Sequence, residues 1–331
     1  MLNIVAIGAS GFIGSRLSKR LLKKTDYNLL IVDKVLSPIY PDLTKTADVR
    51  DIESLRQTIE QNSIIINLAA EHRDDVRPRS LYDDVNVGGA RNLCQVAREK
   101  NIKTIIFTSS VAVYGFAPIG TDESGKINPF NDYGRTKYEA EQIFSEWQAE
   151  DASERALIII RPTVVFGEQN RGNVYNLLRQ VASGRFMMIG DGTNQKSMAY
   201  VENVTAFIEY AISFKPGKYI YNYVDKPDFS MNDLVGKVNY ILGRSEKIKF
   251  RLPFWFGYTV GLLFDVISKL TGKRFAVSSI RIKKFTANTV FGTGIDKLDF
   301  IAPVSISDAL EKTVRHEFVE KHSDKNVFYT E

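Results

Sequence analysis

The stretch Leu2-Asn3-Ile4-Val5-Ala6-Ile7-Gly8-Ala9-Ser10-Gly11-Phe12-Ile13-Gly14 decides the fold, because it runs from a buried strand through a glycine-rich turn into a helix. The first glycines permit a tight turn and let backbone N–H groups approach a pyrophosphate closely. Gly14 lets the helix pack closely on the sheet, and the positive end of the helix dipole faces the phosphates. The turn therefore predicts a dinucleotide-binding unit, with contacts expected from Gly8, Ser10, Gly11, Phe12, Ile13 and Gly14.

Short apolar runs continue this pattern through the first half of the chain. They are Leu29–Val32, Ile64–Leu68, Thr104–Phe107 and Ala156–Ile160, and helical patterns such as Phe12–Lys24 separate them. Continuous runs of this kind between helices are typical of strands buried on both faces of a parallel sheet. We therefore predict an α/β fold, a Rossmann-type doubly wound parallel sheet.

The pattern loosens after about Pro162, where Gly becomes more frequent. This change predicts a smaller C-terminal substrate lobe that is interleaved with the last strands. We expect a dinucleotide-binding Rossmann domain at 1–165, with later strands contributed by the second half, and a substrate-binding lobe at 166–331.

Composition limits the possible functions. Of the 331 residues 44% are hydrophobic and 25% charged, which is ordinary for a globular protein. The net charge of +5 suits a phosphate-rich substrate or an anionic membrane surface without establishing either, and we expect no nucleic-acid partner and no metal site. Cys94 is the single cysteine, and its place on an apolar helix face favours packing over reactivity. With no signal peptide ahead of the first strand, these points indicate a cytoplasmic location.

Asp33 follows the second apolar run, nineteen residues past Gly14. A carboxylate there accepts hydrogen bonds from both adenosine ribose hydroxyls and repels a 2′-phosphate, so NAD is favoured over NADP, although Lys34 weakens this preference slightly. A surface Asp in a turn is the alternative. Asp48 fits either a contact to the adenine amino group or a helix N-cap. Further cofactor contacts are expected from Lys34, Val49, Leu68, the small Ala69 and Ala70, and Ser109.

The segment Tyr133-Gly134-Arg135-Thr136-Lys137 carries the strongest chemical signal. On a helix its two ends share one face, so the Lys137 ammonium is expected near the Tyr133 phenol. A nearby cation stabilises phenolate and is expected to lower a pKa that starts near 10. A tyrosine tuned in this way takes a proton from a substrate hydroxyl near neutral pH, and Lys137 is also placed to hold the nicotinamide ribose.

A serine cluster ends the run Thr104–Phe107, at the sheet edge where doubly wound folds bind ligands. Ser110 in this cluster is a candidate to hydrogen-bond the same substrate oxygen as Tyr133, although serines at a strand end are usually turn residues. The order of glycine-rich turn, Asp33, serine cluster and Tyr133 with Lys137 is very improbable by chance.

These residues resemble those of the extended short-chain dehydrogenase/reductase superfamily, the group of sugar-nucleotide epimerases and dehydratases, over nearly the whole chain. The resemblance implies NAD as the cofactor and Ser110, Tyr133 and Lys137 as the catalytic triad. It also implies that Asn86 lies beside the nicotinamide and that the segment Arg161–Gly167 lines the cofactor and the sugar. The positions that it adds to the expected site are Asn86 and Pro162 for the cofactor and Asn173 for the phosphate side of the substrate.

The residues after Ser110 separate the reactions of this superfamily. Sugar 4,6-dehydratases carry Asp-Glu directly after the catalytic hydroxyl residue, because eliminating water needs an acid and a base. Here Val111 and Ala112 occupy those places, and neither side chain transfers a proton. This leaves epimerisation, in which NAD is regenerated, or a simple oxidation or reduction.

A narrower resemblance, to bacterial epimerases that act on N-acetylglucosamine carried on undecaprenyl diphosphate, rests on four segments. They are Ala69–Val76, Gly172–Leu178, Ser197–Val201 and Tyr221–Pro227. It implies a 4-epimerase for a polyprenyl-diphosphate-linked N-acetylhexosamine in surface polysaccharide (O-antigen) synthesis. Lys196 stands where soluble epimerases place a phosphate-binding arginine, and His72 and Arg281 are further candidates for substrate contact, although a lone histidine is more often structural.

An uncharged, aromatic-rich run, Leu252–Phe264, is too short to cross a bilayer. The residues around it are mostly basic: Arg244, Lys247, Lys249, Arg251, Lys269, Lys273, Arg274, Arg281, Lys283 and Lys284, against Glu246 and Asp265. The segment 250–285 is therefore typical of an element lying on anionic lipid, while a buried helix of the lobe is the alternative. The first possibility places the protein on the inner face of the cytoplasmic membrane.

Three other functions remain open at this point. Two are enzymes, a soluble UDP-sugar 4-epimerase and an NAD(P)H-dependent 4-ketosugar reductase. The third is a non-catalytic NAD-sensing scaffold, against which the intact Ser110, Tyr133 and Lys137 argue. The family resemblance also implies a homodimer through a four-helix contact made by Asp84–Lys100 and Tyr133–Gln148.

Overall fold

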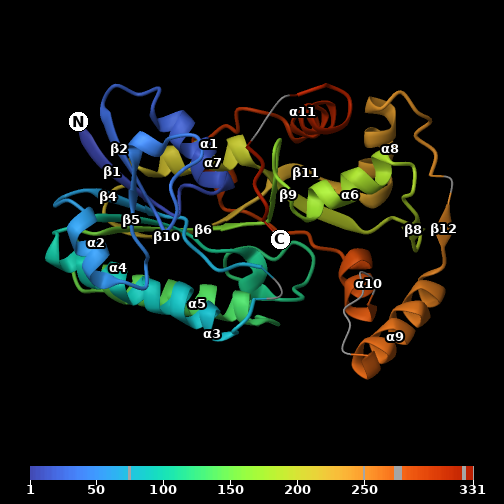
Figure 1. The fold of residues 1–331 in the computed structure, drawn as a ribbon, viewed down its shortest axis with the longest axis horizontal. Helices are drawn as coiled ribbons and strands as arrows, with labels where there is room; N and C mark the ends of the chain where they lie inside the picture. The colour runs from blue at the N-terminus through green and yellow to red at the C-terminus, as the bar shows by residue number, and fades with distance from the viewer. Residues whose placement is uncertain (74–75, 249, 272–277, 323–325, 331) are drawn as a thin grey trace.

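The computed structural model describes the chain except for residues 74–75, 249, 272–277, 323–325 and 331. At its centre lies a seven-stranded sheet between two layers of helices (Figure 1). Its strands, in spatial order, are β10 (Gly217–Tyr223), β6 (Ala156–Pro162), β5 (Thr104–Thr108), β4 (Ile64–Asn67), β1 (Leu2–Ile7), β2 (Tyr27–Asp33) and β3 (Thr44–Thr46). All neighbours pair in parallel, which confirms the doubly wound α/β prediction.

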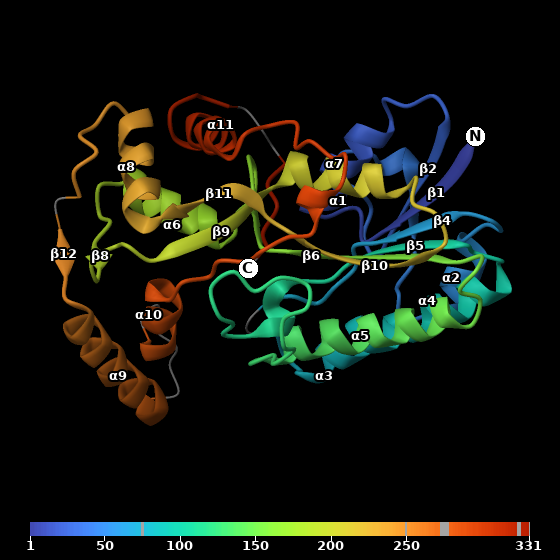
Figure 2. The ribbon, with the colours of Figure 1, turned by 180° about the vertical axis from the view of Figure 1, so that it is seen from behind.

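Helices cover both faces of this sheet (Figure 2). One face carries α1 (Phe12–Leu21) and α7 (Val201–Ala211), and the other carries α2 (Ile52–Thr58), α4 (Gly89–Glu99) and α5 (Asp132–Ala149), with α3 (Ser80–Tyr82) and a π-helix (Asp83–Gly88) leading into α4. Side chains alternate along a strand, so Ile4 and Ala6 join the core beneath α1 and α7, while Val5 and Ile7 join the core beneath α4 and α5.

Two strands of the central sheet were not predicted from the sequence. β3 is a short polar edge strand, and β10 alternates tyrosines with Ile220 and Asn222 instead of forming an apolar run. β10 comes from the second half of the chain and pairs with β6, so the late part of the chain does complete the sheet. α1 ends at Leu21, before the predicted Lys24. The proposed division of the chain at residue 165 stays a prediction.

The remaining elements form a lobe beside the carboxyl edge of the sheet. Its strands are β7 (Val164–Phe166), β9 (Gln195–Tyr200) and β11 (Asp225–Ser230) in one sheet, and β8 (Met188–Ile189) with β12 (Arg251–Leu252) in another. Its helices are α6 (Asn173–Ala182), α8 (Met231–Ile241), α9 (Phe254–Thr271), α10 (Ser279–Thr286) and α11 (Ile306–Phe318). Short 3₁₀ turns lie at Pro41–Leu43, Val111–Tyr114 and Ile295–Lys297. Side chains of α6, α8 and α11 share one core with β9 and β11.

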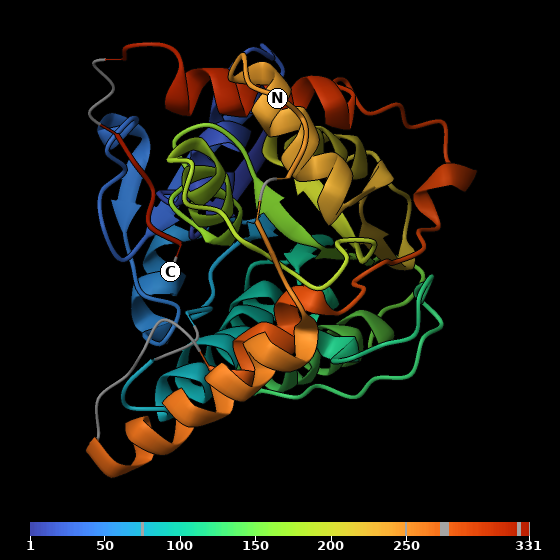
Figure 3. The same cartoon turned by 90° about the vertical axis from the view of Figure 1, so that its right-hand side faces the viewer.

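Helices α9 and α10 project from this lobe as a separate pair (Figure 3). The buried residues of α9 are Gly257 and Gly261, and a Cβ on Gly261 would lie 2.8 Å from the Ser279 Cα. The exposed large apolar residues of α9 are Phe254, Trp255, Phe256, Leu262, Leu263, Val266 and Leu270. The alternative of a buried core helix is therefore wrong. Of the helices that the structure describes, none is long and apolar enough to span a membrane.

Candidate active site

The turn after β1 has the shape that a dinucleotide needs. Gly8 has a φ of +75°, and a Cβ there would lie 2.5 Å from the Ala69 nitrogen. A Cβ on Gly14 would lie 2.2 Å from the Ala9 Cα, whereas one on Gly11 would meet only the Gly8 oxygen, at 3.6 Å. Close packing thus requires Gly8 and Gly14, and Gly11 keeps the approach to α1 open. No side chain caps the start of α1, so its first N–H groups suit a pyrophosphate.

Asp33 is fixed beside this turn. Its Oδ2 accepts a hydrogen bond from the Ser10 backbone N–H at 3.0 Å, and the Ser10 hydroxyl donates to the Val35 carbonyl at 2.9 Å. These bonds join the glycine-rich turn to the end of β2. The Asp33 carboxylate is therefore held at the carboxyl edge of the sheet, where the ribose contact is expected.

Asp48 does not cap α2. The cap is Asp51, whose side chain accepts hydrogen bonds from the backbone N–H groups of Glu53 and Ser54. The Asp48 carboxylate instead accepts a hydrogen bond from the Arg50 guanidinium at 2.6 Å. This bond lowers the pKa of Asp48, and Lys34 lowers it by a smaller amount. The N-cap alternative is wrong, and the adenine contact stays a prediction. Val49, also predicted to touch the cofactor, is buried and packs near Gly89 of α4.

The ends of β4, β5 and β6 come together at one edge of the sheet. The Ser109 N–H donates to the Ile160 carbonyl at 2.7 Å, and the Leu68 N–H donates to the Ile7 carbonyl at 2.8 Å. The Ser109 hydroxyl is buried and has no hydrogen-bond partner among the described residues. A buried hydroxyl of this kind suits a bound polar group, so the edge fits NAD. The other predicted cofactor contacts here are Ala69, Ala70 and the buried Pro162.

The side-chain amide of Asn86 forms hydrogen bonds within the protein. Its Oδ1 accepts the Glu71 N–H at 2.9 Å, and its Nδ2 donates to the Glu71 carbonyl at 3.0 Å and the Thr136 hydroxyl at 2.9 Å. Both amide hydrogens are therefore used. Asn86 ties the chain after β4 to α5 between Tyr133 and Lys137. The predicted contact with the nicotinamide stays a prediction.

The three predicted catalytic residues lie on two adjacent elements. Ser110 caps the 3₁₀ turn Val111–Tyr114, and Tyr133 lies in the first turn of α5, which the Asn131 side chain caps by accepting from the Gly134 N–H at 2.9 Å. The Ser110 side chain lies near enough to the Tyr133 phenol to lower its pKa. Lys137 is buried one turn further along α5, with its Nζ 4.2 Å from the centroid of the Phe107 ring.

The pKa predicted for Tyr133 has the wrong sign. Burial raises the pKa of Tyr133 to about 12, and the nearby Ser110 side chain opposes this only in part. Burial also lowers the pKa of Lys137 to about 7, against the attraction of Glu141. The same loss of water thus disfavours both charged forms, and it outweighs the cation effect expected from helical spacing alone.

Sequence analysis missed Glu141, which forms a buried ion pair with Arg161. The Arg161 Nε lies 2.9 Å from the Glu141 Oε1, and the Arg161 Nη1 donates to the Tyr114 hydroxyl at 2.6 Å. Arg161 therefore braces α5 against β6, and its side chain is not left to line the sugar site. Glu141 was detectable, because it continues the helical face of Tyr133 and Lys137 at the same spacing of four residues.

The predicted substrate residues come from separate elements. His72 is exposed, yet loss of water in the surrounding protein lowers its pKa, and Lys137 adds a smaller effect in the same direction. Asn173 is the exposed first residue of α6, and Arg281 is exposed on α10.

Lys196 donates to the carbonyls of Lys284 at 2.9 Å and Ala287 at 2.7 Å, and burial lowers its pKa to about 8. Its ammonium thus holds the end of α10, and the predicted phosphate contact stays a prediction.

A family model described as the NAD dependent epimerase/dehydratase family matches residues 4–223, from β1 through β10. The chain belongs to this family. NAD is therefore its cofactor, as Asp33 and the glycine-rich turn indicate. Within the family, the chain is 48% identical to the N-acetyl-alpha-D-glucosaminyl-diphospho-ditrans,octacis-undecaprenol 4-epimerase of Escherichia coli O157:H7, over 99% of each chain. This confirms the narrower resemblance seen in the sequence.

Other members of the family are more distant. A UDP-glucose 4-epimerase of Vibrio cholerae is 28% identical, over 82% of this chain and 85% of that one. A UDP-glucuronic acid 4-epimerase from Bacillus cereus in complex with NAD has the same fold, with a TM-score of 0.73 at 20% identity over 95% of this chain and 98% of that one. The epimerase fold therefore extends over the lobe as well as the central sheet.

Proposed function

We propose that the protein is a 4-epimerase that interconverts N-acetylglucosaminyl- and N-acetylgalactosaminyl-diphospho-undecaprenol in surface polysaccharide (O-antigen) synthesis. The observation that carries this proposal is the 48% identity to the Escherichia coli lipid-linked epimerase over 99% of both chains. The site agrees with it, because Ser110 and Tyr133 lie on adjacent elements at the cofactor edge of the sheet.

Tyr133 and Ser110 handle the proton of the sugar 4-hydroxyl. Ser110 hydrogen-bonds the substrate oxygen, and the Tyr133 oxygen takes its proton. Bound NAD supplies the acceptor for the C4 hydride and later its donor. The 4-keto sugar turns over in the pocket, and Tyr133 would then return the proton to the sugar oxygen. Val111 and Ala112 offer no group for elimination, so the product keeps all its oxygens.

Lys137 supplies the charge that this proton transfer needs. From one turn away on the same helix face, its ammonium would offset part of the cost of burying the phenolate form of Tyr133, a cost that raises the pKa of Tyr133 to about 12. The face of the Phe107 ring at 4.2 Å and the nearby Glu141 both favour the charged form of Lys137. The buried Glu141–Arg161 pair keeps that carboxylate in place, so the pair sets the orientation of α5 and its two catalytic side chains.

The exposed side of α9 is where we propose that the protein meets the membrane. Trp255, Leu263 and Leu270 are 68%, 59% and 81% exposed, which is unusual for large apolar side chains on one helix. Trp at one end and cations around the helix suit the headgroup region of an anionic bilayer. Described cations near α9 include Arg251, Lys269 and Lys283, whereas Lys249, Lys273 and Arg274 lie outside the described residues. The protein then sits on the cytoplasmic face of the inner membrane.

The predicted homodimer through α4 and α5 has less support. The outward surface of these helices carries ion pairs, for example Arg98 with Glu150 and Arg135 with Asp83. Within their described residues, neither helix exposes a large apolar side chain. Stable homodimer interfaces are more apolar than this, so dimerisation there stays a prediction for light scattering to test.

A substrate comparison on one purified preparation tests the proposed function. We expect conversion of detergent-solubilised N-acetylglucosaminyl-diphospho-undecaprenol without added NADH, and little conversion of the UDP-linked sugar. Faster turnover of the UDP-linked sugar would favour the soluble epimerase, and a stoichiometric need for NADH would favour the reductase. Bound NAD without turnover of either substrate would favour the scaffold.

A further inference from the structure

Two exposed phenylalanines flank the catalytic residues. Phe116 follows the 3₁₀ turn that Ser110 caps, and Phe130 precedes α5, three residues before Tyr133. They are 48% and 45% exposed, and their ring centroids lie 5.0 Å apart at an interplanar angle of 37°. Two aromatic rings that touch each other usually pack inside a protein, whereas this pair is exposed at the two ends of the loop that joins the 3₁₀ turn to α5.

The loop that carries the pair is anchored at its neck. The Asn128 N–H donates to the Val113 carbonyl at 3.0 Å, and Gly115 has a φ of +65° with no room for a side chain, since a Cβ would lie 2.1 Å from the Asn128 oxygen. The Asn131 cap fixes the other end. The exposure of Phe116 and Phe130 is therefore built into the loop at a fixed distance from Tyr133.

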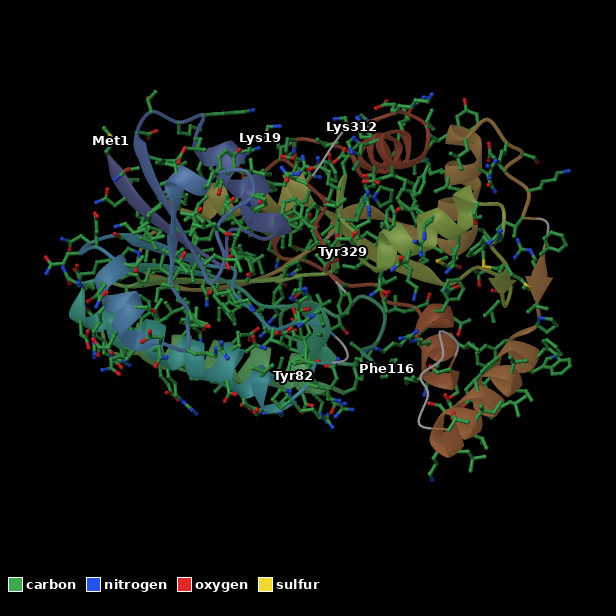
Figure 4. The ribbon with its side chains drawn as sticks, viewed as in Figure 1. Met1, Lys19, Tyr82, Phe116, Lys312 and Tyr329 are labelled. Carbon is green, nitrogen blue, oxygen red and sulfur yellow. The ribbon has the colours of Figure 1, made fainter. Side chains whose placement is uncertain are left out.

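The pair faces the projecting helices. Lys283 Nζ lies 5.5 Å from the Phe116 centroid, and Lys284 Nζ lies 4.8 Å from the Phe130 centroid, both from α10. Figure 4 shows Phe116 on the side of the Rossmann domain nearest α9 and α10. Since α10 packs on α9 at Gly261, the path outward from the catalytic loop runs over the aromatic pair and α10 to the apolar surface of α9.

The order of chemical groups along this path matches one kind of ligand. A sugar held at Tyr133 would be followed outward by positive charge beside two apolar rings, and then by the apolar side of α9. A lipid-linked sugar has the complementary order of neutral sugar, anionic diphosphate and apolar isoprenoid chain. A UDP-linked sugar has a polar nucleoside in the third place and gains nothing from an apolar contact there.

We propose that Phe116 and Phe130 form a subsite for the first isoprene units of the substrate, holding the chain between the catalytic loop and α10. The subsite rests on the proposed function and adds what recognises the lipid next to the diphosphate. The rings guide the first units out of the pocket toward α9, so that the remainder of the chain stays in the bilayer.

The test is the double variant Phe116→Ala/Phe130→Ala, with Ile119→Ala as the matched control, because Ile119 is 64% exposed on the same loop. Three probes are compared: N-acetylglucosaminyl-diphospho-undecaprenol, the same sugar diphosphate on farnesol, and the sugar diphosphate methyl ester. For both isoprenoid probes we expect the double variant to raise KM about 10- to 100-fold with kcat within about twofold. The rise should be equal for the two chain lengths, because only the first units make contact.

The methyl ester and the control variant separate the subsite from a structural effect. Neither the ester in the double variant nor any probe in Ile119→Ala should change by more than about twofold. An equal loss on all three probes, or an unchanged KM for the isoprenoid probes, would overturn the subsite while leaving the proposed function intact. If the unmodified protein fails to convert the undecaprenol-linked sugar, the proposed function falls and the subsite with it. Phe116→Leu/Phe130→Leu, which keeps apolar bulk, should show a smaller rise and guards against misfolding of the alanine variant.

Discussion

Removing two apolar side chains from the exposed side of α9 should detach the protein from membranes. Trp255 and Leu263 are 68% and 59% exposed, so neither contributes much to folding and both are available to insert into lipid. Burying a large apolar side chain fully contributes about 1.5–3 kcal/mol, which gives about 1–2 kcal/mol for each exposed part. Trp255→Ala/Leu263→Ala should therefore weaken membrane binding by about 2–4 kcal/mol, or from about 30-fold to several hundred-fold.

Flotation with vesicles containing anionic phospholipid measures this partitioning directly. The matched control is Tyr240→Ala/Ile301→Ala, since these residues are 71% and 88% exposed but lie elsewhere on the lobe and before α11. The control should float like the unmodified protein, and the thermal stability of both variants should stay close to it. Equal vesicle binding by the α9 variant and the unmodified protein would refute the assignment of α9 to the membrane surface.

Three further predictions concern the cofactor and the catalytic residues. Gly14→Ala places a Cβ 2.2 Å from the Ala9 Cα, so the purified variant should contain less NAD and melt at a lower temperature. Tyr133→Phe should lower kcat by about 10²- to 10⁴-fold while the NAD content, measured after denaturation, stays unchanged. Burial lowers the pKa of Lys137 from 10.5 to about 7, so the folded protein binds fewer protons than the unfolded chain between these values, and this group makes the free energy of unfolding rise with pH across that window. Urea unfolding of Lys137→Met should lack this part of the rise, which is at most about 1.4 kcal/mol per pH unit, and identical pH profiles would contradict the shift.

The fold was predictable wherever burial on both sides imposed an apolar run. The strand ending at Ile7 and its glycine turn were recognised because two independent constraints coincide there, and Gly8 and Gly14 prove to be sterically required. β10 was missed because it lies at the edge of the sheet, where its tyrosines pack from one side only. Edge strands carry a weaker pattern than central ones, so local composition alone could not identify it.

The site was predictable in its residue types but less so in its electrostatics. Helical spacing placed Tyr133 and Lys137 on one face, yet it could not show how deeply that face is buried, and burial decides the direction of both pKa shifts. Lys196 also holds the end of α10, a role that its expected phosphate contact did not suggest. Contacts of that kind join segments about 90 residues apart, and no local pattern reports them.

The course of the C4 hydrogen tests the central claim most directly. N-acetylglucosaminyl-diphospho-undecaprenol carrying deuterium at C4 is converted by the purified protein with no nicotinamide cofactor added, and the product is analysed by mass spectrometry and NMR. The account predicts an N-acetylgalactosamine product that keeps the deuterium at C4, because the hydride leaves and returns within one site governed by Tyr133. Loss of the deuterium to solvent, or conversion that proceeds equally well in Tyr133→Phe, would contradict it.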